Sequence, residues 1–213
     1  YDWYFEHTSR FDVAKQAFDR IDIPVHVVTG NHDYRTGVLP QSFTHDLIAA
    51  KWEVEPYYSI EHKGHLFVVL NCQIGPTYNE TYVHTGSFGQ EQLQWFANEL
   101  ERGLPTFVFM HYPLFLVSQD EGALTMPGLI QQHRQQIRMV VTGHLHHWWD
   151  FSDSVWPNNL TIAATRFDGR NHLLVEADPS ATEATIVNHD DICWQGMLYR
   201  NSEADENCLP AIP

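Results

Sequence analysis

Three short apolar runs, each followed at once by a polar signature, constrain this 213-residue chain more than any other feature. The pairs are 23–28 with Gly-Asn-His-Asp at 30–33, 106–110 with His-Tyr-Pro at 111–113, and 138–141 with Gly-His-Leu-His-His at 143–147. Short β-branched and aromatic runs bounded by Gly or Pro are typical of buried strands. Ligand sites of open α/β sheets collect at the carboxyl ends of strands, so we expect the polar groups to meet at one rim. The groups there that can bind a metal or a phosphate are Asn31, His32, His111, His144 and His146.

Helical and strand patterns alternate along most of the chain, and short strands follow in its last quarter. The apolar spacing predicts helices at 11–20, 41–51, 90–101 and 128–136. The predicted strands are 23–29, 57–60, 66–71, 106–110, 138–142, 160–164, 172–177 and 184–188. Ser87 is expected to cap the helix that begins near Gln90. This order predicts the α/β class, with helices outside one sheet and a second sheet packed against it.

The length supports one substantial domain and is short for two. We expect one domain over 1–189, followed by a polar, acidic C-terminal tail over 190–213.

The charge balance limits the classes of partner. Lys and Arg number 12 against 27 Asp and Glu, a formal net charge of -15. DNA and anionic membrane surfaces require a basic footprint, so neither is expected as a partner. The sequence has no stretch of transmembrane length, and no signal peptide is visible at a start that lacks Met. An acidic enzyme acting on phosphate would need bound cations to reverse its field at the site.

Cysteines and glycosylation patterns lean toward an extracytoplasmic location and leave a cytoplasmic one open. Cys193 and Cys208 bracket a polar segment that a disulfide could close, and sequons begin at Asn79 and Asn159. Cys72 follows an apolar run and is expected to be a small buried hydrophobe.

The histidines near the ends of the apolar runs form a pattern that suits metal binding. His144 and His146 are one residue apart, and His111 would come from a neighbouring strand. Neutral imidazole is the commonest protein ligand for metals, and the amide oxygen of Asn31 suits harder ions. Each histidine taken alone is better explained as structural, as we expect for His26 within its apolar run. Together at one rim they indicate a ligand set.

The three signatures in this order resemble the calcineurin-like metallophosphoesterases. More loosely, they resemble the calcineurin-like phosphoesterase-domain protein phosphatases. Residues 92–96 and 111–116 add to the resemblance, which covers about 11–180. It implies an α/β/β/α sandwich of two mixed sheets flanked by helices. It also implies two divalent or mixed-valence metal ions, of Mn, Fe or Zn.

The resemblance implies a role for each matching residue. Asn31, His111 and His144 would bind the second metal, and Asn31 would also touch the phosphate. His146 would bind the first metal. His32 would stabilise the transition state or protonate the leaving oxygen. A two-metal site of this kind activates a hydroxide for in-line attack on phosphorus.

Two motifs of the family, an Asp-x-His strand and a Gly-Asp motif before the Asn-His-Asp segment, are not found in this chain. Asp2 could be the remnant of the Gly-Asp motif, or that motif could end just before Tyr1. We therefore expect the first β-α segment of the fold to be missing from this sequence. Hydrolysis of a phosphate ester is the leading hypothesis. The alternative is a catalytically impaired relative that binds a metal or a partner. A structural zinc domain is disfavoured, because such zinc usually recruits Cys in close pairs.

The loops beside these signatures are expected to shape the substrate cleft. The candidate substrate contacts are Arg35, His84, His147 and Trp148. Asp33 is expected to satisfy backbone donors in its turn rather than to take part in catalysis. The substrate could be a phosphorylated small molecule, a nucleotide or a phosphoprotein, as a monoester or a diester.

Overall fold

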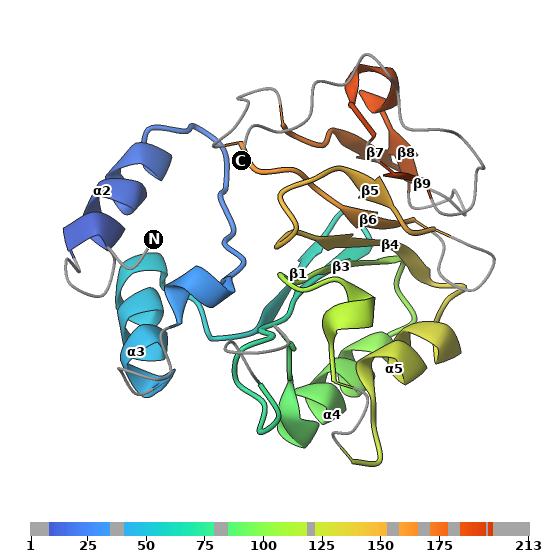
Figure 1. The fold of residues 1–213 in the computed structure, drawn as a ribbon, viewed down its shortest axis with the longest axis horizontal. Helices are drawn as coiled ribbons and strands as arrows, with labels where there is room; N and C mark the ends of the chain where they lie inside the picture. The colour runs from blue at the N-terminus through green and yellow to red at the C-terminus, as the bar shows by residue number, and fades with distance from the viewer. Residues whose placement is uncertain are drawn as a thin grey trace.

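The computed structural model describes residues 9–34, 41–78, 85–118, 122–152, 158–165, 171–178, 184–194 and 196–197, with only the backbone for 9–11, 41–44 and 196–197. The residues named above that lie outside these ranges are Tyr1, Asp2, Arg35, Asn79, His84 and Cys208. In the described residues, helices lie against one face of a large sheet and a small sheet lies against the other (Figure 1).

The large sheet is mixed and has seven strands in the order β1-β2-β3-β4-β6-β5-β9. The strands are β1 (Tyr58–His62), β2 (His65–Val69), β3 (Thr106–Phe109), β4 (Ile137–Thr142), β5 (Trp149–Asp150), β6 (Asn159–Thr161) and β9 (Gly196–Met197). The neighbours β2, β3, β4 and β6 run parallel, so their carboxyl ends share one edge. β1 runs antiparallel to β2. Lys63 and Gly64 join these two strands with positive φ angles of 47° and 76°, which matches the tight turn of a hairpin.

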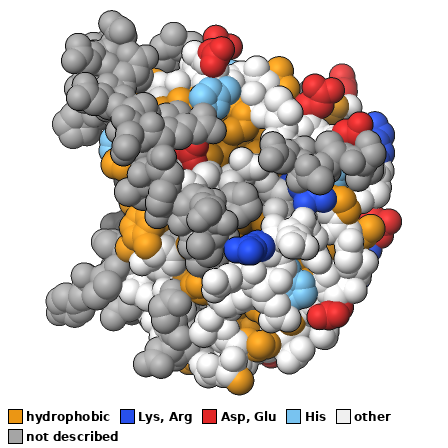
Figure 2. Space-filling model, turned by 90° about the vertical axis from the view of Figure 1, so that its right-hand side faces the viewer, with side chains coloured by type: hydrophobic (Ala, Val, Ile, Leu, Met, Phe, Trp, Pro, Cys, Tyr) orange, Lys and Arg blue, Asp and Glu red, His pale blue; other side chains and the backbone are white. Residues whose placement is uncertain are grey.

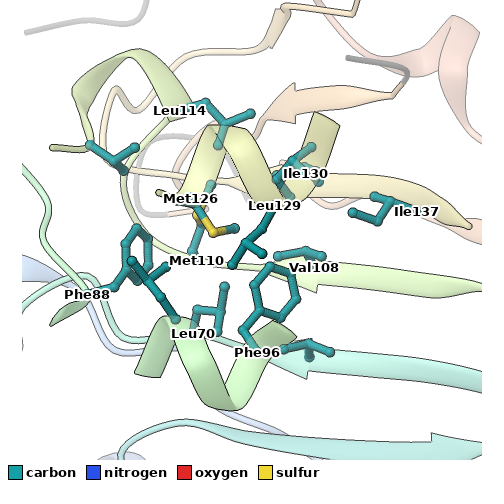
Figure 3. Close-up of a cluster of buried hydrophobic side chains, with 14 of the residues drawn as sticks. Leu70, Phe88, Phe96, Val108, Met110, Leu114, Met126, Leu129, Ile130 and Ile137 are labelled. Atoms are coloured by element: carbon teal, nitrogen blue, oxygen red, sulfur yellow. The ribbon is translucent and has the colours of Figure 1, made fainter. Parts of the chain in front are cut away.

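The main hydrophobic core lies between the large sheet and two helices, α4 (Gly89–Leu100) and α5 (Met126–Gln132). Alternate residues of β3 and its extension point to opposite faces, so Val108 and Met110 pack toward these helices. Figure 3 shows them among Phe96 of α4 and Met126 of α5. Two other helices, α2 (Ser9–Phe18) and α3 (Gln41–Trp52), lie beside the sheet, at the left of Figure 1 near the chain's N-terminus.

The second face of the large sheet packs against the small antiparallel sheet of β7 (Val175–Ala177) and β8 (Ala184–Ile186). Phe107, Met139 and Trp148 are buried there. The predicted α/β class, with helices on one face and a second sheet on the other, is confirmed. The second sheet is a two-stranded antiparallel pair within the described residues, rather than a mixed sheet.

The predicted tail does not begin at residue 190. Ile192 and Trp194 are buried against the second face, at 8% and 7% exposed. The two residues of β9 pair with β5 in the large sheet. The described residues 190–194 and 196–197 therefore belong to the fold, because they supply apolar surface and backbone partners to it.

Two local predictions were wrong. Residues 24–30 form no strand, and Ile23 and Val28 are 69% and 39% exposed. No described strand pairs with this segment, although the hydroxyl of Tyr58 donates to the Val27 carbonyl at 2.8 Å. Ser87 does not cap α4. Its Oγ accepts from the backbone N–H of Thr77 at 3.2 Å and so closes the preceding loop instead.

The features that suggested a location receive little support from the described residues. Asn159 lies within β6 at 6% exposed, so its sequon is not accessible in the folded chain. Cys72 is buried, as expected, and is not part of a disulfide. The sequon at Asn79 and the Cys193–Cys208 pairing reach beyond the described residues and stay predictions. In the part of the chain that the structure describes, none of the helices has the length and apolarity to span a membrane.

Candidate metal-ligand site at the strand ends

Three predicted ligands meet at the carboxyl edge of the large sheet. His111 follows β3 and His144 follows β4, while Asn31 begins the short 3-10 helix η1 (Asn31–Asp33). Nε2 of His111 lies 2.7 Å from Oδ1 of Asn31 and 3.2 Å from Nδ1 of His144. Three atoms that could bind a metal ion therefore converge from distant parts of the sequence. Two of them lie within hydrogen-bond distance of Nε2 of His111.

The two strand ends are joined by backbone hydrogen bonds. The N–H of Gly143 donates to the His111 carbonyl at 3.0 Å, and that of Met110 donates to the Val141 carbonyl at 3.1 Å. Beyond this point His144 and His146 both adopt left-handed backbone conformations, with φ of 66° and 60°. Non-glycine residues rarely adopt this conformation, and such strain is concentrated at functional sites.

The ring of His111 is packed closely against two neighbouring residues. A Cβ on Gly30 would lie 2.9 Å from Cε1 and Nδ1 of His111, so the glycine leaves room that a larger residue would fill. The ring of Tyr112 also lies against it, edge-on at 5.2 Å between centroids. Tyr112 also lies 4.3 Å from the ring of His144. The orientation of both imidazoles is therefore fixed by packing.

His111 is held in its neutral form. The pKa of its imidazole is lowered to about 3, mainly by burial and in addition by the nearby His144, His32 and His146. A neutral imidazole keeps a lone pair available for a metal ion at physiological pH. These effects also place His32 and His146 in the neighbourhood of His111, with His32 exposed and His146 partly buried.

Asp33 has the structural role expected of it. Its Oδ2 accepts the backbone N–H of Gly30 at 2.8 Å and so closes the turn that carries Asn31 and His32. Burial raises the pKa of this carboxyl group, and the hydrogen bond from Gly30 partly offsets that rise.

The donor set fits one divalent ion. Two imidazole nitrogens and an amide oxygen suit Mn, Fe or Zn. Across the described ranges, no group of three or more His, Cys, Asp or Glu side chains is placed to hold a metal ion without other donors. The cluster therefore depends on the amide oxygen of Asn31 as its third donor. Of the residues assigned to the other ion, His146 is described and Asp2 is not, so that assignment stays a prediction.

The predicted substrate contacts are not brought together in the described residues. Trp148 is 3% exposed, lies edge-on to Trp194 at 5.6 Å, and donates from Nε1 to Oδ1 of Asn171 at 3.0 Å. Its prediction as a substrate contact is wrong, because the indole is enclosed in the core. His147 is partly buried and stays a candidate. Arg35 and His84 lie outside the described residues.

Sequence reasoning missed a set of buried polar residues behind the cluster. Asn71, which follows β2, donates from Nδ2 to the hydroxyl oxygen of Tyr34 at 2.6 Å. Gln92 of α4 bonds to both backbone groups of Asn71, at 2.8 and 2.9 Å. The signal was present, because Asn71 is a polar residue directly after an apolar run, as His111 is.

This chain is similar to proteins that are described or named as phosphoesterases. A family model described as calcineurin-like phosphoesterase matches residues 2–148. The human protein "Serine/threonine-protein phosphatase CPPED1" is 31% identical over 158 residues, which cover 68% of this chain and 48% of that protein. A protein of Synechococcus sp. named "Probable cyclic nucleotide phosphodiesterase syc0937_d" is 27% identical over 143 residues, covering 64% of this chain and 51% of its own length. The chain spans about half the length of these curated relatives. A solved structure described as a dimetal phosphatase from Danio rerio aligns with a TM-score of 0.47 at 15% identity, over 74% of this chain and 68% of that one.

Proposed function

The chain belongs to the calcineurin-like phosphoesterase family, and we propose that it hydrolyses a phosphate ester at the cluster of Asn31, His111 and His144. Members of this family are hydrolases of phosphoric ester bonds. The single observation that carries the proposal is the convergence of the three side chains, with separations of 2.7 and 3.2 Å about Nε2 of His111.

Each residue of the cluster has a proposed task. Asn31, His111 and His144 would hold one divalent ion, and His146 would contribute to a second. Bound ions would supply positive charge to the phosphate oxygens and lower the pKa of water at the site. Since Oδ1 of Asn31 faces His111, its amide N–H groups would be free to donate to a phosphate oxygen. His32, exposed in the same turn, would donate a proton to the leaving oxygen.

The charge of the chain supports a requirement for bound cations. The net charge of -15 disfavours the approach of a phosphate. On the face shown in Figure 2, the Lys and Arg side chains of the described residues stand apart from one another and form no basic stripe. Metal ions would supply the positive field that these residues do not.

The substrate class follows from the relatives only as a proposal. One relative is named as a protein phosphatase and another as a cyclic nucleotide phosphodiesterase. A phosphoprotein or phosphorylated small molecule as a monoester, and a nucleotide as a diester, are therefore the substrates to compare. The alternative is a relative that binds a metal ion or a partner without turnover. Its support is that His146 is the one described residue assigned to the other ion.

Hydrolysis of an aryl phosphate monoester and of a bis-aryl diester, with the protein loaded with Mn²⁺, tests the proposal. We expect one of the two esters to be hydrolysed and the His32→Ala variant to lose about 10²–10³-fold in kcat, because the leaving oxygen loses its proton donor. His62→Ala is the matched control, since His62 is also exposed but lies in β1.

Loss of activity in both variants, or in neither, would show that His32 has no specific role. If the metal-loaded protein binds Mn²⁺ but hydrolyses neither ester, the non-catalytic alternative is the better description.

A further inference from the structure

Three buried polar side chains lie directly behind the turn that carries Asn31 and His32. Tyr34, Asn71 and Gln92 are each at most 1% exposed, and they come from the end of the turn, the end of β2 and the helix α4. Buried polar groups are costly unless hydrogen-bonded, so a connected set of them in this place requires an explanation.

The hydrogen bonds of this set form one continuous chain. Gln92 accepts from the backbone N–H of Asn71 at 2.8 Å and donates to its carbonyl at 2.9 Å. Oδ1 of Asn71 accepts the backbone N–H of Gln73 at 2.9 Å. This bond orients the amide so that Nδ2 faces the hydroxyl oxygen of Tyr34, at 2.6 Å. The Tyr34 hydroxyl is thus linked by hydrogen bonds to Asn71 at the end of β2 and, through Gln92, to α4.

The same hydroxyl also closes the turn. Tyr34 follows η1 and Thr29 precedes Gly30, and the two side chains are hydrogen-bonded to each other. The turn is also held by two backbone bonds, from the N–H of Asp33 to Gly30 at 3.0 Å and from that of Tyr34 to Asn31 at 3.2 Å, and by the bond from the Gly30 N–H to Oδ2 of Asp33 at 2.8 Å. The side chains at both ends of the segment 29–34 therefore meet at the Tyr34 hydroxyl, beside Asn71.

The phenol ring of Tyr34 is held in place by a ring contact, and burial keeps its hydroxyl group protonated. The ring of His45 from α3 lies edge-on to it at 5.4 Å between centroids. Burial raises the pKa of Tyr34 to about 12, so its hydroxyl keeps its proton at any physiological pH.

We propose that Tyr34, held by Asn71 and Gln92, is a positioning residue that fixes the turn carrying Asn31 and His32 against the strand-borne His111. The segment before the turn belongs to no strand, so no sheet ladder does this work among the described residues. The consequence for metal binding and hydrolysis rests on the proposed function. The effect on the turn itself does not. Residues that orient metal ligands typically contribute 10–100-fold to metal affinity.

The Tyr34→Phe variant removes the hydroxyl and keeps the ring. In the metal-free protein, we expect the amides of residues 33 and 34 to exchange with solvent about tenfold faster. The amides of Met110 and Gly143, which bond between strand ends, should be unchanged. With Mn²⁺, we expect the dissociation constant from calorimetric titration to rise about tenfold. Tyr58→Phe is the matched control, because it removes a tyrosine hydroxyl that bonds upstream of the turn, at Val27.

Asn71→Ala provides a second route. If Tyr34 acts through Asn71, the double variant Y34F/N71A should exchange at residues 33 and 34 little faster than N71A alone. Additive effects would show that the two residues act independently and would overturn the proposal.

The remaining outcomes separate the proposal from the function on which its consequence rests. Unchanged exchange at residues 33 and 34 in Tyr34→Phe, or equal acceleration throughout the sheet, overturns the positioning role whatever the activity. Accelerated exchange with unchanged Mn²⁺ affinity and unchanged kcat also overturns it, since the turn would then not need to be fixed. If the parent protein neither binds Mn²⁺ nor hydrolyses an ester, the proposed function fails while the exchange comparison still decides how the turn is held.

Discussion

The candidate site has two halves that are held in different ways. His111 and His144 extend from adjacent parallel strands, and backbone bonds between the strand ends fix their Cα positions. Asn31 and His32 stand on a short turn after a segment that joins no sheet in the described residues. On that turn, hydrogen bonds of side chains such as Tyr34 and Asn71 help to fix the backbone position, which bonds between strands fix in the other half. The strand half is therefore built into the fold, whereas the turn half depends on a few specific contacts.

The strongest way to break the strand half is to remove its central donor. His111→Ala should abolish measurable Mn²⁺ binding and lower kcat/KM by roughly 10³-fold, about 4 kcal/mol of transition-state stabilisation. The melting temperature of the metal-free protein should change little, because the strand ladder remains. Calorimetric titration and initial rates test this, with His26→Ala as the control histidine outside the cluster. Full metal affinity in His111→Ala would remove this residue from the ligand set.

The interface between the two halves can be tested with a pair of glycines. A Cβ on Gly30 would lie 2.9 Å from the His111 ring, whereas a Cβ on Gly143 would lie an ordinary 3.7 Å away. Gly30→Ala should displace the imidazole and reduce kcat/KM by about 10–100-fold, with a stability loss of about 1–3 kcal/mol from overpacking. Gly143→Ala should stay within about threefold of the parent. Equal rates in the two variants would show that the ring tolerates displacement.

The smallest effect on activity is expected behind the strand half. Trp148→Phe should lower the free energy of unfolding by about 1–3 kcal/mol, because a buried indole and its hydrogen bond to Asn171 are lost. The KM for an aryl phosphate should not change, since the indole presents no surface to substrate. Denaturant unfolding and steady-state rates measure the two quantities. A KM that rises severalfold without a loss of stability would restore Trp148 as a substrate contact.

The strand half was predictable because its information is local. Apolar runs of four to six residues predicted β3 and β4, and a polar residue directly after each run marked the shared edge. The run at 23–28 carried the same pattern, yet it forms no strand. A strand requires a neighbour to accept its backbone bonds, and sequence pattern alone does not supply one. The loop-closing role of Ser87 was hidden for a similar reason, since its partner Thr77 is ten residues away.

The amino-acid sequence by itself determined the α/β class and the residues that gather at the strand ends, and it carried the family signature. These depend on short-range periodicity and on chemistry at fixed positions, which a linear pattern preserves. Tertiary structure alone decided that Trp148 is enclosed, that residues 190–194 and 196–197 complete the fold, and that Asn71 and Gln92 reach Tyr34 behind the turn. These outcomes depend on which distant side chains become neighbours once backbone groups and apolar surfaces have found partners, and that pairing exists only in three dimensions.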